Sequence, residues 1–60
     1  MTLYDKVKEI ADANGLSIAA LEVKAGIANG TISGWKTGKP YAETLKKVAD
    51  VLEVPIEELL

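Results

Sequence analysis

Few side chains in this sequence are suited to catalysis or to metal binding. The 60 residues include no His and no Cys, which removes imidazole bases, thiolate nucleophiles, disulfides and the usual zinc ligands. Ser17 and Ser33 carry hydroxyl groups, but no base is evident that could activate either of them. We therefore expect neither an enzyme nor a metal site, and no cofactor.

Two further patterns match functional motifs only in part. Gly34, Gly38 and Lys39 resemble a glycine-rich phosphate loop, but their spacing is one residue short. Pro40 also stands where that loop requires a hydroxyl residue. Acidic residues recur at helical spacing near the C-terminus, and a solvated acidic face explains them better than a calcium site does. These residues are Asp50, Glu53 and Glu57.

The charges are segregated along the chain although the net charge is only −2. Residues 24–47 hold five Lys and one Glu, whereas residues 1–23 hold two Lys and four acidic residues. Residues 48–60 hold four acidic residues and no cation. One interpretation is that the basic middle is steered toward phosphate while the acidic flanks are kept away. The other is an ordinary solvated surface on which the charges happen to segregate.

Apolar residues recur at helical spacing along the chain, and no stretch alternates long enough to form a strand. This spacing predicts an all-α fold, a compact bundle of five short helices that forms one domain over residues 1–60. A chain this short buries only about 60% of its extended surface, so its core must rely on packing alone. No apolar run approaches the roughly 18 residues of a membrane span, and the N-terminus lacks the features of a signal peptide. We expect a cytoplasmic protein.

The first two helices have clear start and stop signals. The first is expected to begin after Thr2, where Asp5 completes a capping box, and to end at residues 14–15. The second is expected to begin after Ser17 and to end at Gly26. The apolar residues of its inner face are Ile18, Leu21 and either Ala25 or Val23.

The remaining helices are shorter or less well marked. A third helix is predicted over residues 28–36, with Trp35 in the core rather than exposed as a stacking platform. Residues 37–40 are expected to form a turn, because they contain Gly and end in Pro. A fourth helix is predicted over residues 42–52, and a fifth is expected to begin at Pro55.

Residues 21–32 fit a helix-turn-helix, in which two short helices meet across a tight turn. Gly26 can turn the chain between the helices. Leu21, Ile27 and Ile32 supply the apolar contacts that fix the angle between them. A generic helical hairpin could supply the same features, so this geometry alone does not decide the function.

Over nearly its whole length the chain resembles the lambda-repressor-like helix-turn-helix domains of phage repressors and related bacterial regulators. The most specific stretches are residues 15–17, 25–27, 31–35, 38–40, 43–45, 48–49 and 52–54. Residues 29–33 and the short turn to Pro40 are most similar to repressors from phages of Gram-positive bacteria. The resemblance implies a transcriptional regulator that binds a palindromic double-stranded DNA site as a homodimer.

The resemblance also implies roles for individual residues, with the third helix in the major groove. The expected base-facing residues are Ala28, Asn29, Gly30, Thr31, Ser33 and Gly34. The expected phosphate contacts are Ser17, Lys36, Thr37, Gly38 and Lys39. The expected dimer contacts at the C-terminal end are Val54, Pro55, Ile56 and Leu60. Asn29 is the best single reader, because its amide can bond an adenine edge in two places.

Several positions depart from the family pattern. Most relatives carry Gln where this chain has Ile18, and many carry Arg, Lys or Gln where it has Gly34. Tyr41 replaces the usual Ser cap of the fourth helix, and Glu53 replaces the Gly that usually ends it. The groove-facing surface is therefore small and uncharged, which either lets the backbone approach DNA closely or reflects drift. A rival function follows from this bare face, the acidic total and the absence of Arg: a protein-interaction module with little DNA affinity.

Overall fold

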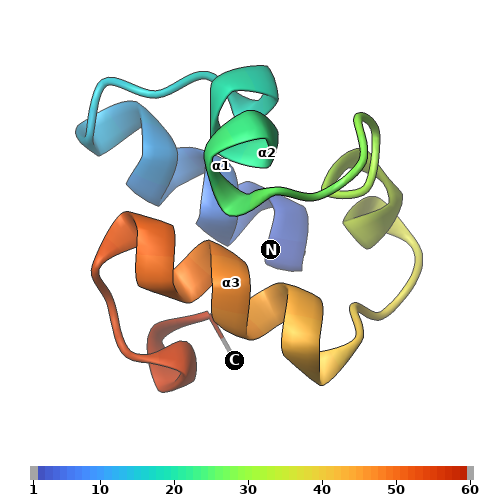
Figure 1. The fold of residues 1–60 in the computed structure, drawn as a ribbon. Helices are drawn as coiled ribbons and strands as arrows, with labels where there is room; N and C mark the ends of the chain where they lie inside the picture. The colour runs from blue at the N-terminus through green and yellow to red at the C-terminus, as the bar shows by residue number, and fades with distance from the viewer. Residues whose placement is uncertain (1, 60) are drawn as a thin grey trace.

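The computed structural model describes residues 2–59, and within them the chain forms three α-helices and two 3-10 turns (Figure 1). The α-helices are α1 (Leu3–Ala13), α2 (Ile18–Ala25) and α3 (Ala42–Leu52). The 3-10 turns are η1 (Ser33–Lys36) and η2 (Ile56–Glu58). No strand occurs between residues 2 and 59. The all-α prediction is confirmed, but two of the five expected helices are single 3-10 turns.

The starts of α1 and α2 form as predicted. The Thr2 hydroxyl accepts a hydrogen bond from the Asp5 backbone N–H at 3.2 Å, and the Asp5 carboxylate accepts one from the Thr2 N–H at 3.0 Å. Ser17 caps α2 by accepting from the Ala20 N–H at 3.1 Å. Gly26 ends α2 with φ +71°, in the left-handed region where glycine carries no Cβ penalty.

Helix α3 lacks favourable residues at its two capping positions, as its departures from the family pattern suggest. Tyr41 occupies the N-cap position and makes no side-chain hydrogen bond to the helix. Glu53 follows the last turn with φ 57°, a left-handed conformation that costs an L-residue roughly 1–2 kcal/mol. The helix therefore relies chiefly on the packing of its inner face, with Glu43 in its first turn and backbone hydrogen bonds at its C-cap adding support.

Two helix predictions are wrong in detail. Residues 29–32 form turns, and only Ser33–Lys36 becomes helical, as η1. Gly30 has φ +92°, which a right-handed helix cannot include. Pro55 does not begin a helix but precedes η2 in an extended conformation, with ψ 150°.

The core draws on every helical segment except η2, together with Ile32 and Leu59. Helix α2 packs on α3, and η1 packs on α1 (Figure 1). The buried apolar residues are Val7, Ala11, Leu21, Ile32, Trp35, Leu45, Val48, Ala49, Leu52 and Leu59. Trp35 is thus a core residue, as predicted. On α2, Ala25 packs against the core while Val23 is 80% exposed, which settles that alternative. Between residues 2 and 59, no helix is long and apolar enough to cross a membrane.

Candidate nucleic-acid interface

The segment that the sequence singles out, residues 27–36, forms a surface strip held down by two buried side chains. We call it the reading segment. Ile32 is fully buried and Trp35 is 5% exposed, so both anchor the segment in the core. The segment leaves α2 at Gly26 and returns toward α1 through η1, at the side of the molecule opposite the α1–α2 turn (Figure 1).

A buried carboxylate fixes the start of the reading segment. Glu22 is only 3% exposed, and its Oε2 atom accepts hydrogen bonds from the backbone N–H groups of Gly30 and Ile32, each at 3.0 Å. Hydrogen bonds to an ionised carboxylate are roughly twice as strong as neutral ones. Within residues 2–59 its partners are these amides and not a cation. Glu22 therefore links α2 directly to the segment.

Glu22 positions the reading segment, and the sequence analysis did not identify it. A signal was present, because Glu22 lies four residues after Ile18 and three before Ala25, on the same apolar stripe of α2. An acidic residue in such a stripe must find buried donors or destabilise the fold. The sequence does not show where those donors lie, because they come from a turn eight to ten residues further along.

The same hydrogen bonds explain why the predicted third helix is shortened. The Gly30 and Ile32 N–H groups bond to the carboxylate rather than to the carbonyl groups of a preceding helical turn. The Thr31 hydroxyl donates to the Ala28 carbonyl at 2.7 Å, so a side-chain hydrogen bond also stabilises this turn. Together with the positive φ of Gly30, these bonds delay helical geometry until Ser33.

The structure places most of the predicted base-facing residues together on the surface. Ala28, Asn29, Gly30, Ser33 and Gly34 are all exposed. The Asn29 side chain makes no hydrogen bond within residues 2–59, so its amide is available to a ligand.

The other members of the set differ among themselves. Thr31 is half-buried and its hydroxyl proton is already used, which leaves it less suited to contact a base than predicted. A Cβ on Gly34 would meet nothing within 4 Å and its φ is ordinary, so packing inside the domain does not require glycine there. Gly30, in contrast, needs glycine for its positive φ.

The predicted phosphate contacts divide into open and occupied groups. Ser17, Thr37, Gly38 and Lys39 are exposed. Lys36 is also exposed, but its Nζ lies 4.7 Å from the centroid of the Tyr4 ring, in a cation–π contact with α1. Lys36 is therefore already engaged with α1, whereas Lys39 has no such contact within residues 2–59.

The predicted dimer contacts offer less free apolar surface than expected. Val54 and Ile56 are half-buried and pack against the core. Pro55 between them is exposed. Leu60 lies outside the described residues.

Comparisons with known proteins identify the family of this chain. A family profile described as helix-turn-helix matches residues 7–59. The chain is 40% identical over 58 residues to a protein of Bacillus subtilis (strain 168) named as an uncharacterized HTH-type transcriptional regulator, RghRB. The match covers 92% of this chain and 42% of that relative, so the chain spans less than half of the relative's length. The resemblance inferred from the sequence is confirmed at this level: the chain belongs to the helix-turn-helix family.

Proposed function

We propose that this domain binds double-stranded DNA in a sequence-dependent way, as the DNA-reading part of a transcriptional regulator. The observation that carries the proposal is the exposed Asn29 amide on a segment whose backbone is fixed by Glu22. Family membership and the name of the Bacillus subtilis relative support the same function.

In the proposed complex the reading segment faces base edges in the major groove. Asn29 bonds an adenine edge through both atoms of its amide, which contributes about 1–3 kcal/mol of discrimination between bases. Ser33 adds a hydroxyl, and Gly34 lets the backbone approach the bases because it has no side chain. Ser17, at the start of α2, and residues 37–39 bind phosphates on either side of the segment.

Phage-type repression from a palindromic site is the finer part of the proposal. It rests on the similarity of residues 29–33 and of the turn to Pro40 to phage repressors. Two copies would meet at the C-terminal end, where Pro55 is exposed beside the half-buried Val54 and Ile56. Sedimentation with and without DNA tests this pairing, and a strict monomer in both states would contradict it.

Salt-dependent binding and site selection test the main proposal. The wild-type chain is titrated with a pool of random duplexes at several salt concentrations, and preferred sites are then selected from the pool. We expect affinity to fall steeply with salt, because bound phosphates release counterions. We also expect the selected sites to share a motif containing adenine. Absence of salt-sensitive binding even at low ionic strength would contradict the proposal and favour the protein-interaction module.

A further inference from the structure

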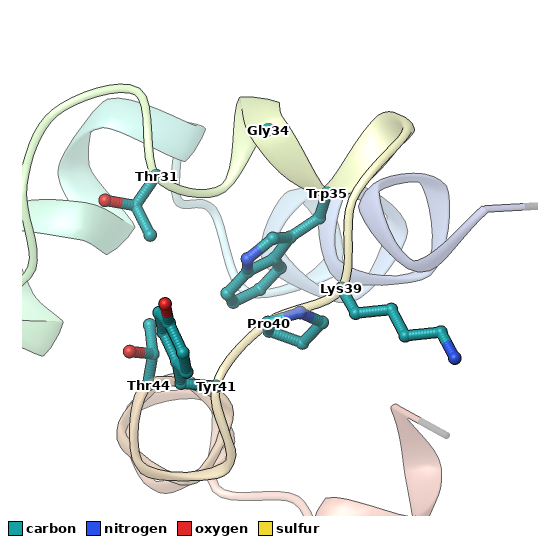
Figure 2. Close-up of a pocket in the computed structure, with 7 residues that line it drawn as sticks. All are labelled: Thr31, Gly34, Trp35, Lys39, Pro40, Tyr41 and Thr44. Atoms are coloured by element: carbon teal, nitrogen blue, oxygen red, sulfur yellow. The ribbon is translucent and has the colours of Figure 1, made fainter.

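A half-open pocket lies beside the reading segment, between η1 and the start of α3 (Figure 2). Its volume is about 220 Å³. One side belongs to the reading segment and the other to the turn that leads into α3. The lining residues are Thr31, Gly34, Trp35, Lys39, Pro40, Tyr41 and Thr44.

The wall of this pocket carries an unused hydrogen-bond donor. Trp35 is only 5% exposed, yet its indole N–H has no hydrogen-bond partner within residues 2–59. No fully enclosed side-chain nitrogen or oxygen in this part of the chain lacks a partner, so the indole nitrogen must reach solvent. Figure 2 shows that the ring edge bearing this nitrogen faces the space between Thr31 and Tyr41.

The other polar groups of the pocket favour a ligand that accepts hydrogen bonds and carries negative charge. The lining includes Lys39 and no carboxylate. The hydroxyl groups of Tyr41 and Thr44 can donate, whereas that of Thr31 already donates to the Ala28 carbonyl. An amine or a metal cation would find no charged partner here.

The apolar surfaces of the pocket indicate what the anion is attached to. Trp35, Pro40 and Tyr41 present rings to the pocket, and Tyr41 is 84% exposed, which is unusual for so large a side chain. Such surfaces pack well against the carbon face of a sugar ring. A phosphate ester of a sugar combines both properties, because it has charged acceptor oxygens beside an apolar ring.

We propose that this pocket receives one phosphate–deoxyribose unit of the DNA strand that passes the reading segment. The Trp35 indole N–H and the Thr44 hydroxyl donate to a phosphate oxygen, and the Tyr41 ring packs against the sugar. This proposal rests on the proposed DNA binding and adds three contacts to it. Gly34, an exposed member of the predicted base-facing set, also lines the pocket, so a strand whose bases are read there would pass it.

The test uses the fact that Trp35 is the one Trp of the chain. The ¹⁵N-labelled protein therefore shows one indole N–H cross-peak in its NMR spectrum. We titrate it with a duplex that carries a selected site. We expect this cross-peak to move with the same midpoint as the backbone amides of Asn29 and Ser33.

Variants of three lining residues measure the contribution of the pocket. Thr44→Val keeps the side-chain shape and removes a donor, so we expect DNA affinity to fall about 2–10-fold with unchanged unfolding by urea. Trp35→Phe removes the indole donor. Its DNA affinity is compared with that of the wild type at a temperature where both proteins are folded, and we expect it to be lower. Tyr41→Ala removes the ring that packs against the sugar, so we expect DNA affinity to fall. Val23→Ala is its control at another exposed large apolar side chain, where affinity should stay the same.

The possible results separate this proposal from the proposed function. One result would overturn the pocket assignment and leave DNA binding intact. In it the backbone amides shift and binding depends on salt, but the indole signal does not move and Thr44→Val binds DNA as tightly as the wild type. No amide shifts and no binding would overturn both. Thymidine 5′-monophosphate serves as a separate probe. An indole shift with this nucleotide but not with the duplex would overturn the assignment to DNA in favour of a small phosphorylated ligand.

Discussion

Within residues 2–59, two carboxylates accept backbone hydrogen bonds, and their settings are opposite. Asp5 lies on the surface and accepts from the N–H of Thr2, three residues away, at the first turn of α1. Glu22 lies in the interior and accepts from the N–H groups of Gly30 and Ile32, eight and ten residues away. The first contact shapes one helix end, and the second joins two parts of the fold.

The difference shows which of the two contacts the folded conformation depends on more. Water can replace the Asp5 contact, because the groups involved are exposed. Water cannot easily replace the contacts of Glu22, since they are enclosed between α2 and the reading segment. The conformation of the exposed reading face therefore depends on Glu22 as well as on the buried Ile32 and Trp35.

Glu22→Ala should have the largest effect. Two amides would lose their acceptor and a space would open, so we expect a loss of about 2–4 kcal/mol in the free energy of unfolding. Domains of this size are stable by only a few kcal/mol, so much of the population would unfold. Urea unfolding followed by circular dichroism measures the change.

Glu22→Gln sharpens this prediction. The amide oxygen can still accept both hydrogen bonds but the charge is gone, so we expect a loss of about 1 kcal/mol and a retained fold. Hydrogen exchange of the Gly30 and Ile32 amides should speed up in this variant before that of the core. Glu9→Ala, on the exposed face of α1, is the control and should change stability by less than about 0.5 kcal/mol. Equal effects of the Glu9 and Glu22 substitutions would contradict the comparison.

Asn29→Ala tests whether the segment that Glu22 holds is the part that reads DNA. We expect affinity for a selected site to fall about 5–100-fold, while affinity for random duplexes and the salt dependence stay unchanged. Competition binding with both kinds of duplex measures this ratio. Asn14→Ala at the far end of α1 is the matched control. A uniform loss on all sequences would instead assign Asn29 to phosphate binding.

The contrast between the two carboxylates also explains what could be predicted from the sequence. The capping box at Thr2, the cap at Ser17 and the stop at Gly26 use residues within a few positions of one another, so local patterns were sufficient. The helical spacing of Ile32 and Trp35 likewise placed both in the core.

The shape of the reading segment could not be predicted in the same way. Its helix was expected from residue 28 because Ile32 and Trp35 fit a helical period, and Gly30 was counted only as a weak helix residue. The competing geometry depends on Glu22, which belongs to another helix and meets the segment only in the folded chain. The pocket at Trp35 was missed for the same reason, since its walls come from η1 and from the start of α3.

Glu53→Gly gives a smaller effect of opposite sign. Glu53 has φ 57°, which is unfavourable for a residue with a Cβ and favourable for glycine. We expect a gain of about 0.5–1 kcal/mol in the free energy of unfolding. The control is Glu9→Gly, inside α1, which should lose about 1 kcal/mol. Because this strain is local, DNA affinity and the hydrogen exchange of the Gly30 amide should not change. A change in either would show that α3 affects the reading segment.

The pH dependence of Asp5 is the smallest expected effect. Hydrogen bonds from the backbone and the side chain of Thr2 lower the pKa of Asp5 below its ordinary value of 3.8. Because the folded pKa is the lower one, the contact stabilises the fold above the ordinary value and is lost as the pH falls through the folded pKa. Stability measured by urea unfolding should therefore decline with acid below pH 3.8, and Asp5→Asn should flatten that decline. An unchanged decline in Asp5→Asn would show that other carboxylates cause the acid sensitivity. It would also show that the Asp5 hydrogen bonds add nothing measurable to stability, unlike those of Glu22.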